Sequence, residues 1–484
     1  MKRRGAQASL RWYYYPMSKQ ELTTQFSKQN QAADFRSYDA VIVGGGASGL
    51  TCAIACMQAL QGRDSVQTDT SYSAQRNPRI LILESGRRIG ASIMRSGNGR
   101  CNFSHTNVDS ASYYNASFVE QAFAAHATNE RIPSVISWFE HLGLVWDEMP
   151  GSGGLLYPFS RKANSVLDVL RCALDEYGIE VQEGRRVEKI VQSDPSIWRI
   201  SGMATECVTS KKEGNFRKKK GGKAIEKPSE PSPFEVCARN VVVASGGTTP
   251  QTLYQAGSVT YVSPHAVLGP LAAYTDGVSL QSLDGIRVQA RITIPARSFS
   301  EEGEVLFRGY GISGIVVFNA SRFAQAGDVL YLDLVPHIGE DALFDSLLKR
   351  AQLLKGRNPE EFLTGFVVAP LARALLEKIS GSFARDFKLN QKHLRSLAAL
   401  LKAFPMTIEG IADERACQVH RGGVQVSQVN PSTMELASLP RMYVLGEALD
   451  IDAPCGGYNL HWAWTTGLLA GYALADEFSK GLDQ

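Results

Sequence analysis

A glycine-rich turn near the start of the chain does most to limit what this sequence can fold into. Gly44, Gly46 and Gly49 have the spacing G-x-G-x-x-G, between the apolar run 39–44 and an alanine- and cysteine-rich segment at 47–60. The first glycine permits a tight turn, the second lets the backbone approach a pyrophosphate, and the third lets the helix pack closely on the strand. We therefore expect a dinucleotide-binding strand, turn and helix in a Rossmann-like α/β domain.

The other end of the chain carries a second set of glycine motifs. Gly446 and Glu447 follow a short apolar run at 441–445, and Gly456 and Gly457 precede a helix-like stretch. A helix that begins beside glycines presents free backbone N–H groups and a partial positive charge to a ligand. The sequence therefore predicts one discontinuous nucleotide domain that both ends of the chain build together.

An acid that binds ribose is expected at the end of the second strand of such a domain, about 20 residues after the glycine turn. The run 79–84 is apolar throughout and ends in Glu84, as a parallel strand buried on both faces does. The polar segment 61–78 accounts for the longer spacing, and we expect it to be an inserted surface loop. The alternative for Glu84 is a solvated carboxylate with no ligand.

Composition limits the broader possibilities. A chain of 484 residues is too long for one hydrophobic core, and its net charge of +3 indicates no particular partner. No apolar run approaches the ~18 residues of a membrane span. The eight cysteines have irregular spacing, so we expect neither a disulfide framework nor a metal site, and a reducing cytoplasm as the compartment.

Changes in the pattern of apolar and polar residues along the chain predict its domain organisation. Helices are expected at 117–142 and 163–178, and alternating segments such as 286–294 predict an antiparallel subdomain. A basic run at 211–227 predicts a solvated insertion, with nucleic-acid binding as the alternative. The expected parts are a disordered N-terminal extension at 1–37, with a targeting segment as the alternative, the nucleotide domain at 38–250 with a surface insertion at 208–233, a β-rich insertion at 251–338, a helical insertion at 339–405, and the rest of the nucleotide domain at 406–484.

Several longer motifs resemble one known family, the HI0933-like or aminoacetone-oxidase-like flavoproteins, which include a bile-acid ene-reductase branch. The resemblance extends over roughly 38–475. Its motifs are Ser96-Gly-Asn-Gly-Arg-Cys-Asn102, Phe307-Arg-Gly-Tyr-Gly-Ile-Ser-Gly314, Arg421-Gly-Gly-Val424, Val429-Asn-Pro-Ser-Thr-Met434, Gly446-Glu-Ala-Leu-Asp450 and Gly456-Gly-Tyr-Asn-Leu-His-Trp-Ala463. The segment after Gly247 is shorter than in many relatives, and His461 stands where many of them have glutamine.

The resemblance implies FAD as the cofactor, and a dinucleotide domain interrupted by β-barrel-like and helical insertions. It implies that the backbone of Val187 contacts the adenine and that Gly446 and Glu447 line the ribityl chain. It also implies a helix start at 457–459 beside the flavin pyrimidine ring, where partial positive charge stabilises reduced flavin. The expected cofactor-binding residues are Gly44, Gly46, Ala47, Ser48, Gly49, Glu84, Ser85, Gly97, Asn98, Gly99, Arg100, Cys101, Asn102, Val187, Ala244, Ser245, Gly246, Gly446, Glu447, Gly456, Gly457, Tyr458 and Asn459.

The implied activity is that of an FAD-dependent oxidoreductase. A hydride would pass through flavin N5 between NAD(P)H or an organic donor and a small organic substrate, by enone reduction or amine oxidation, or to oxygen. The chain has no second G-x-G-x-x-G motif, so NAD(P)H is expected to visit only transiently. Arg100, Cys101, Asn102, Tyr458 and His461 are candidates to lie beside the ring, with no acid or base assigned. An FAD-containing RNA-modification or nucleic-acid-associated protein is the alternative, and a scaffold that binds flavin without turnover is a third possibility.

Overall fold

The structure is a computed structural model that describes residues 37–64, 78–205, 230–255, 257–354, 361–380 and 390–480. The expected extension at 1–37, apart from Ser37, lies outside these ranges. So do residues 65–77 of the polar loop expected at 61–78 and the whole basic run at 211–227. The loop was expected to start too early, because residues 61–64 are the last turn of helix α2 (Ala47–Asp64). Tyr38–Gln484 forms one compact unit, and no helix among the described residues has the length and apolar character needed to cross a membrane.

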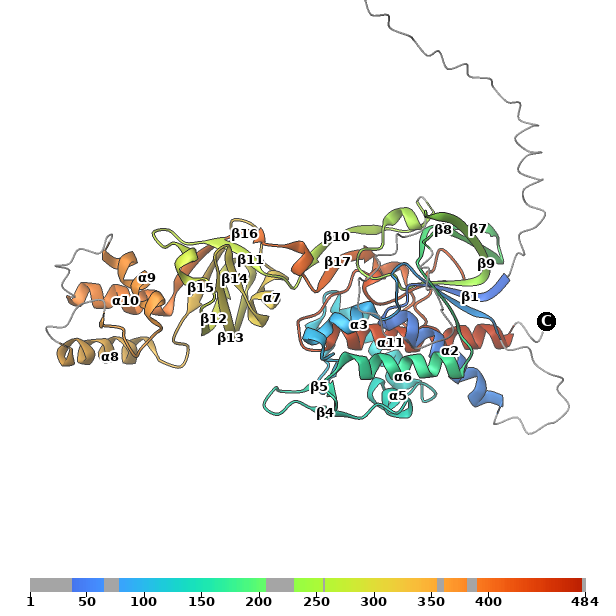
Figure 1. Cartoon of the computed structure of the whole chain (residues 1–484), viewed down its shortest axis with the longest axis horizontal. Helices are drawn as coiled ribbons and strands as arrows, with labels where there is room; N and C mark the ends of the chain where they lie inside the picture. Colours follow the sequence, from blue (N-terminus) through green and yellow to red (C-terminus); the bar gives the residue numbers. More distant parts are fainter. Residues whose placement is uncertain are drawn as a thin grey trace, which may run out of the picture. The chain divides into compact units, whose positions relative to one another are not determined.

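A seven-stranded sheet forms the centre of the nucleotide domain, and strands from both ends of the chain contribute to it (Figure 1). β1 pairs in parallel with β2, with Ala40 opposite Ile80, and β18 pairs in parallel with β9, with Met442 opposite Val241. This discontinuous sheet confirms the Rossmann-type fold. Its strands are β1 (Ser37–Val43), β2 (Ile80–Glu84), β6 (Glu180–Glu183), β7 (Arg185–Asp194), β8 (Ile197–Ala204), β9 (Ser232–Val243) and β18 (Met442–Val444). The expected insertion at 208–233 therefore overlaps the start of β9.

Helices α2 (Ala47–Asp64) and α11 (Tyr458–Lys480) lie against each other beside this sheet (Figure 1). Glycines on α11 permit a close approach of the two backbones. A Cβ on Gly467 would lie 2.7 Å from the Ser48 carbonyl oxygen, and one on Gly471 would lie 2.7 Å from that of Cys52. The small residues that made the sequence of α2 unusual are thus explained by contact with a helix from the other end of the chain.

The single helix expected at 117–142 is wrong, because the structure has two helices there. α4 (Ala116–Thr128) ends before an extended residue, and α5 (Val135–His141) begins after Ser134. The Ser134 hydroxyl accepts a hydrogen bond from the Ser137 N–H at 3.2 Å, which is a helix N-cap. Pro133 disfavours helical geometry in the residue before it, so the chain breaks at this point. α6 (Ala163–Glu176) confirms the other expected helix.

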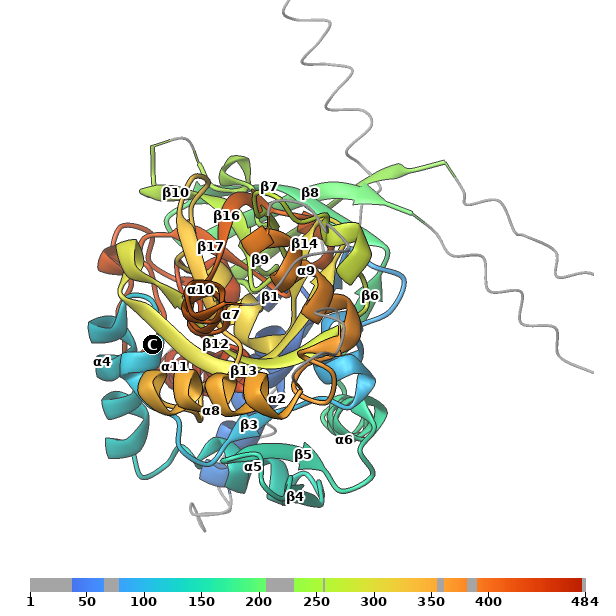
Figure 2. The ribbon, with the colours of Figure 1, turned by 90° about the vertical axis from the view of Figure 1, so that its left-hand side faces the viewer.

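A closed six-stranded barrel forms the β-rich insertion; its strands are labelled in Figure 1, and Figure 2 draws it turned by 90°. Its interior is apolar: Ile292, Phe307 and Leu330 are fully buried. The last strand follows the helical insertion, so the expected boundary at 406 falls within it. The barrel strands, in order, are β11 (Leu271–Tyr274), β14 (Gly311–Ser313), β13 (Phe299–Arg308), β12 (Arg287–Ile294), β15 (Val329–Asp333) and β16 (Phe404–Ile411).

The helical insertion and three smaller elements complete the described fold. Asn390 and His393 form a capping box that starts the last of the insertion's helices. The insertion contains α8 (Glu340–Leu353), α9 (Ala369–Ser380) and α10 (Gln391–Lys402). The smaller elements are the ribbon of β10 (Tyr261–Val267) and β17 (Val419–Val424), the sheet of β3 (Ser104–His105), β5 (Leu155–Pro158) and β4 (Trp146–Glu148), and the helix α7 (Ile315–Ser321), which packs on the barrel. The short helix α3 (Ala91–Arg95) and several 3-10 turns make up the remaining helical structure of the described residues.

Candidate cofactor and active site

The glycine turn has the geometry that its spacing predicts. Gly44 has a φ of +113°, and a Cβ there would lie 2.3 Å from the Ala244 carbonyl oxygen. A Cβ on Gly49 would lie 2.1 Å from the Gly44 oxygen, so both positions require glycine for close packing. Beside Gly46 only the Ser92 hydroxyl is near, at 3.5 Å. The backbone at Gly46 therefore borders open space, at the start of α2 where Ala47 and its neighbour Ser48 lie.

Glu84 ends β2 next to this turn. Its Oε2 accepts a hydrogen bond from the Gly45 N–H at 2.9 Å, and its Oε1 accepts one from Gly86 at 2.5 Å. The Ser85 hydroxyl lies 3.4 Å from Oε1. A carboxylate has about four acceptor positions, and three are used here, so about one remains on Oε2 for a ribose hydroxyl. The Gly184 N–H donates to the Gly86 oxygen at 2.9 Å, which brings the start of β7, and hence Val187, close to this acid.

The two ends of the chain meet at Gly446. A Cβ there would lie 3.0 Å from the Ser48 hydroxyl, and its N–H donates to Thr466 Oγ1 at 3.1 Å. Glu447 accepts a hydrogen bond from the His420 N–H at 3.0 Å, and burial raises the pKa of its carboxyl to about 7. The segment 244–246 lies on the other side of the glycine turn. The Ser245 hydroxyl is hydrogen-bonded to Thr249 at 2.7 Å, so its side chain is already engaged.

A second group of expected residues forms the loop 96–102. Gly97, Asn98, Gly99 and Cys101 all have positive φ angles between 54° and 78°. Asn98 and Cys101 are not glycine, and such strain in non-glycine residues gathers at functional sites. The tight turn buries Asn102, whose Oδ1 has no hydrogen-bond partner in the described structure. That orphaned acceptor is the feature of this loop that most directly indicates a ligand with an N–H group.

The start of α11 lies against this loop. Gly457 has a φ of +91°, and a Cβ there would be 2.4 Å from the Ser104 oxygen and 3.0 Å from Asn102 Oδ1. The Asn459 amide is hydrogen-bonded to the backbone of Ala453, at 3.0 Å and 2.8 Å, so it shapes the preceding loop. The first N–H groups of α11 have no partner within the helix, and they begin beside the Asn102 side chain.

Tyr458 and His461 differ in their surroundings. The Tyr458 ring stacks on His105 at 4.9 Å, and its hydroxyl lies 3.4 Å from the Asn107 oxygen. His461 Nδ1 is hydrogen-bonded to the Ser104 hydroxyl at 2.8 Å. Burial, with the neighbouring His126 and His105, lowers the pKa of His461 to about 3. His461 is therefore neutral near neutral pH and positions β3 and α11 relative to each other.

Cys101 and Cys455 are both free thiols. Burial raises the pKa of each thiol to about 12, so neither is a thiolate near neutral pH. A reactive cysteine needs a depressed pKa. The two side chains therefore pack as small neutral groups.

Two tryptophans of α11 connect the groups, and the sequence analysis did not select them as site residues. The Trp462 indole N–H donates to the Gly446 oxygen at 3.3 Å, and the Trp464 indole N–H donates to the Phe103 oxygen at 2.9 Å. Trp462 lies within the C-terminal motif given above, and Trp464 follows directly after its last residue, Ala463. Two tryptophans so close together on one helix could have indicated that the helix contacts two different loops, here the one at Gly446 and the one that ends at Phe103.

A buried ionic cluster, which we call the Asp452 cluster, holds the loop that leads into α11. Arg322, at the end of α7, donates from Nε to the Asp452 carboxylate at 2.5 Å, and Arg421 donates to the same carboxylate from Nη2 at 3.0 Å. Burial favours protonation of Asp452, but hydrogen bonds from Arg421 and the charges of both arginines outweigh it, so its pKa is lowered. Sequence reasoning missed this cluster, because its three residues are far apart in the chain.

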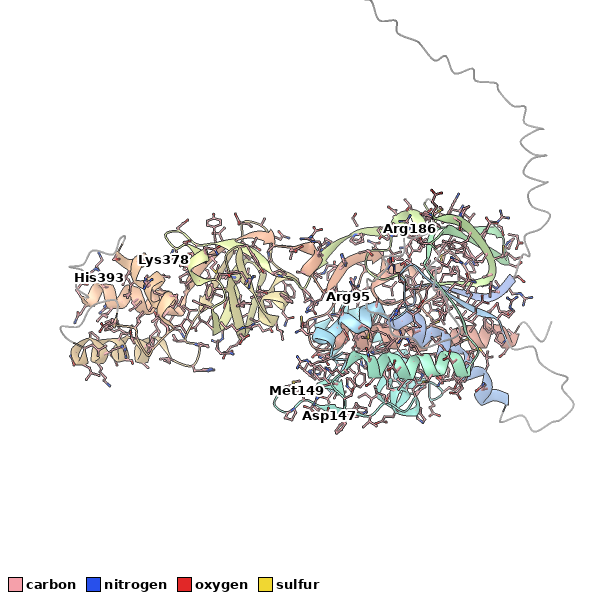
Figure 3. All side chains as sticks on the ribbon, viewed as in Figure 1. Arg95, Asp147, Met149, Arg186, Lys378 and His393 are labelled. Atoms are coloured by element: carbon pink, nitrogen blue, oxygen red, sulfur yellow. The ribbon has the colours of Figure 1, made fainter. Side chains whose placement is uncertain are left out.

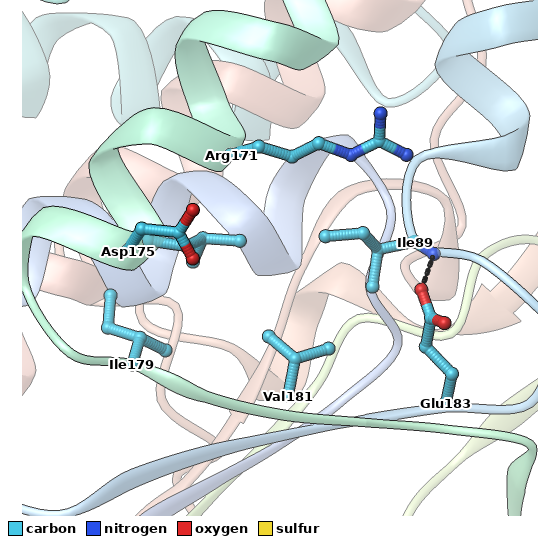
Figure 4. A pocket seen from close by; sticks show the side chains of 7 residues that line it. Ile89, Arg171, Asp175, Ile179, Val181 and Glu183 are labelled. Atoms are coloured by element: carbon cyan, nitrogen blue, oxygen red, sulfur yellow. Dashed lines mark hydrogen bonds between the residues drawn. The ribbon is translucent and has the colours of Figure 1, made fainter. Parts of the chain in front are cut away.

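The groove in Figure 4 lies outside the site. It has a volume of about 440 Å³, and none of the expected site residues lines it. Ile89 forms one wall and donates its N–H to Glu183 at 2.9 Å. Its side chain also lies where a Cβ on Gly45 would be, at 2.6 Å. Ile89 thus stands between the groove and the glycine turn.

The residues present fit FAD. The backbone beside Gly46 borders open space at the start of α2, Glu84 retains an unused acceptor position next to it, and the orphaned Asn102 oxygen lies at the start of α11. Helix starts bind anionic groups. Among the described residues no group of histidine, cysteine and acidic side chains is suited to a metal ion.

The fold and the site define an FAD-dependent oxidoreductase with a discontinuous Rossmann domain. The model of the HI0933-like protein Rossmann domain matches residues 38–473, and the chain therefore belongs to this FAD-binding family.

Known proteins similar to this chain include a 3-dehydro-bile acid delta(4,6)-reductase of Clostridium scindens. It is 28% identical over 90% of this chain and 98% of its own length. A ribosomal RNA dihydrouridine synthase of Haemophilus influenzae is 25% identical over 91% of this chain and 98% of its own. Among solved structures, a 3-ketosteroid-delta4-(5alpha)-dehydrogenase from Rhodococcus jostii RHA1 matches with a TM-score of 0.40 and 12% identity, over 92% of this chain and 98% of that one.

Proposed function

We propose that this protein reduces a carbon–carbon double bond that is conjugated with a carbonyl group. The observation that carries the proposal is the approach of Gly457, at the start of α11, to the buried and unpartnered Asn102 Oδ1. A helix start stabilises negative charge, and the reduced flavin ring is anionic along its pyrimidine edge. An acceptor and a helix start at one edge therefore suit a flavin that is held ready to donate a hydride.

The names of the relatives support the same chemistry. A 3-dehydro-bile acid with 4,6 unsaturation has double bonds conjugated with its 3-keto group. Dihydrouridine is uridine with one double bond saturated, and that bond is conjugated with a ring carbonyl. In both cases a hydride adds to the carbon remote from the carbonyl, and a proton adds to the nearer carbon.

Each part of the proposed site has a role in binding. When bound, FAD supplies the hydride from N5, and we propose NAD(P)H as the transient donor that reloads it. The Gly46 backbone and the start of α2 bind the pyrophosphate, Glu84 binds the ribose, and the β7 backbone at Val187 contacts the adenine. Gly446 and Glu447 would line the ribityl chain, and the 97–102 loop and the start of α11 would hold the ring.

Tyr458 is the residue that we propose as the proton donor. Its phenol is partly exposed, and burial raises its pKa, so it carries a proton near neutral pH. His461 is already deprotonated there, since its pKa is lowered to about 3. Tyr458→Phe should slow the oxidation of reduced enzyme by an enone while reduction by NAD(P)H stays unchanged.

The first test is to identify the flavin and its reactions. The purified protein should release FAD on denaturation, bleach anaerobically with NADH or NADPH, and regain colour when 4-androstene-3,17-dione is added. Release of FMN would contradict the cofactor assignment. Recovery of colour only with oxygen, or bleaching by an amine alone, would favour the oxidase direction over enone reduction.

Gly457→Val tests the site assignment. The valine side chain would collide with Ser104, so FAD should be lost or its potential lowered. A helix end contributes about 0.3–2 kcal/mol, and about 30 mV corresponds to 1.4 kcal/mol for two electrons. The expected change is therefore some tens of millivolts. Gly339→Val is the matched control, because no atom lies within 4 Å of a Cβ there and FAD should be retained.

RNA modification is the second candidate function. It is favoured by the second relative's name and by the region 85–108, which contains four arginines and no acidic residue. Formation of dihydrouridine in RNA on incubation with the enzyme and NADPH would support it. If RNA stays unmodified while a free enone is reduced, a small-molecule substrate is favoured.

A further inference from the structure

One surface beside the proposed flavin site has an excess of positive charge. Between Glu84 and Asp109 the chain contains Arg87, Arg88, Arg95 and Arg100 and no acidic residue. None of the four forms an ion pair with another described residue, as the recorded ion pairs show. In the proposed function the glycine turn binds the FAD pyrophosphate, so the positive charge of these arginines would be available to another ligand.

Arg100 belongs to a compact group that we call the Tyr157 cluster: Arg100, Tyr157 and Arg161. The guanidinium carbons of the two arginines lie 5.5 Å and 5.3 Å from the centroid of the Tyr157 ring. Both distances are within the range of a cation–π contact. A Cβ on Gly97 would lie 3.6 Å from Cε1 of this ring. The cluster therefore lies directly beside the loop that holds Asn102.

The hydrogen-bonding capacity of the cluster is only partly used. Arg161 Nη2 donates to Asp147 Oδ2 at 2.9 Å, but Arg161 Nη1 and Asp147 Oδ1 are both buried and have no hydrogen-bond partner in the described structure. Arg100 is exposed, and its one side-chain hydrogen bond to a described residue is from Nε to the Gly97 oxygen at 3.4 Å. Asp147 lies on β4, which pairs with β5, and Figure 3 labels it there, with Arg95 above it.

Only Arg161 is paired with a carboxylate, that of Asp147, and the Arg100 guanidinium forms no ion pair with a described residue. A buried donor without an acceptor costs free energy, and Arg161 also holds a positive φ of 54°, unusual for a residue other than glycine. An oxyanion would satisfy the free donors of both arginines, because guanidinium groups match carboxylate and phosphate in shape and charge.

We propose that the Tyr157 cluster binds an anionic oxygen group, a carboxylate or a phosphate, that is part of the substrate. The inference rests on the proposed function, because it places the anion beside the ring edge at which the double bond is reduced. It makes the substrate class an enone with a covalently attached acid group at a fixed distance. Neutral enones of similar shape would then bind through apolar contacts only.

The test uses the FAD-loaded full chain and two steroids. One is 3-oxochol-4-en-24-oate, which has an enone and a side-chain carboxylate, and the other is the neutral 4-androstene-3,17-dione. Binding is followed by the change in the visible flavin band. Arg100→Ala and Arg161→Ala should each raise the Kd of the carboxylate by about tenfold, the usual effect of losing one charge-assisted hydrogen bond. The Kd of the neutral steroid should stay within about twofold.

Arg395→Ala is the matched control, since the Arg395 guanidinium also lies over an aromatic ring, that of Phe344, at 5.0 Å. It lies on α10 of the helical insertion and should leave both dissociation constants unchanged. Arg100→Lys keeps the charge without the planar fork, so it should recover only part of the lost affinity. The affinity for the carboxylate steroid should therefore decrease from the wild type to Arg100→Lys to Arg100→Ala, and a purely structural role for Arg100 would not give this order.

A short oligouridylate forms a second arm, because phosphate is the other source of an oxyanion. Weaker binding of the oligouridylate to the arginine variants, with little effect on the carboxylate steroid, identifies phosphate as the ligand, and the reverse identifies carboxylate. Three results would overturn the proposal: an equal rise in the Kd of both steroids in the arginine variants, no change in the Kd of the anionic probes in these variants, or no binding of either anionic probe to the wild-type protein. Loss of FAD from both variants would also overturn it, by assigning the cluster to the cofactor.

The proposed function can fail separately. If the anionic probes bind in a cluster-dependent way and neither accepts a hydride, the anion site stands and the reaction is wrong. If enones are reduced with no dependence on Arg100 or Arg161, the reaction stands and the anion site is wrong.

Discussion

The Asp452 cluster and the Tyr157 cluster have the same components and use them differently. Each contains two arginines, one aspartate and a tyrosine ring: Arg421 lies 4.4 Å from the centroid of Tyr114 in the first, as Arg100 and Arg161 lie near Tyr157 in the second. Both arginines pair with Asp452 in the first cluster, whereas only Arg161 pairs with Asp147 in the second. The Asp452 side chain has no exposed surface, whereas the side chain of Asp147 is 40% exposed.

The two clusters differ most in the partners of their guanidinium groups. In the Asp452 cluster, Arg322 also donates to the Ser112 oxygen at 3.2 Å, and Arg421 donates to the Arg322 oxygen at 2.9 Å. These bonds lie within the protein and connect α7, β17 and the loop before α11. In the Tyr157 cluster a buried donor lacks an acceptor. The Asp452 cluster, whose arginines have partners within the protein, therefore stabilises the fold, whereas the unpartnered donor of the Tyr157 cluster indicates a ligand.

The largest effect is expected when Asp452 is changed to alanine. This change leaves Arg322 and Arg421 buried without a counter-charge, and breaking a buried pair in this way costs about 3–5 kcal/mol. The free energy of unfolding in urea, followed by tryptophan fluorescence, should fall by that amount. A loss below about 1 kcal/mol would mean that the two clusters do not differ as described.

Acid should weaken the Asp452 cluster in a defined direction. The pKa of Asp452 is lowered in the folded protein, so below about pH 4 the unfolded chain binds the proton more readily. The contribution to stability is therefore present above that pH and is lost as the pH falls through the folded pKa. In a plot of the free energy of unfolding against pH, Asp452→Asn should have a shallower acid limb than the wild type. Parallel acid limbs would contradict the lowered pKa.

Replacing the whole Asp452 cluster should cost less than breaking it. In the triple variant Arg322→Met, Arg421→Met and Asp452→Leu, no charge is left buried, and such replacements are often neutral or stabilising. Its free energy of unfolding should exceed that of Asp452→Ala. If the triple variant is as unstable as Asp452→Ala, the ion pairs of the cluster themselves contribute to the free energy of unfolding, beyond neutralising one another.

The smallest stability effect is expected at Asp147, where the ion pair with Arg161 is partly exposed. Asp147→Asn should change the free energy of unfolding by about 1 kcal/mol or less. It should also bind 3-oxochol-4-en-24-oate more tightly, because Arg161 loses its internal competitor. Tighter binding of the anion with little loss of stability would sharpen the contrast with Asp452. Weaker binding would show that Asp147 mainly orients Arg161.

Local sequence was enough where a motif carries its own geometry. The glycine turn, the strand that ends in Glu84 and the start of α11 were all predicted, since backbone conformation at these glycines follows from the absence of a side chain. The break between α4 and α5 was also local, but it depended on a serine cap after a proline, which periodicity alone does not reveal.

Other features had no local signal. Strand β16 closes the barrel only after three helices have intervened, so no window of sequence contains both it and its partner β11. The Asp452 cluster likewise joins residues from three separate segments. An isolated arginine in a sequence is ordinarily a solvated surface residue, and only tertiary contacts distinguish the buried Arg322 from the exposed Arg100.

The sequence by itself determined the nucleotide domain, the two ends that build it and the family to which they belong, because short-range sterics and apolar periodicity specify strands, turns and helices. Only the tertiary structure decided which polar groups are left without partners. Asn102 Oδ1 and Arg161 Nη1 became candidates for ligand binding once every neighbouring donor and acceptor had a position. The partners of a buried polar atom are set by the tertiary structure, so the sequence alone does not show which buried atoms lack a hydrogen bond.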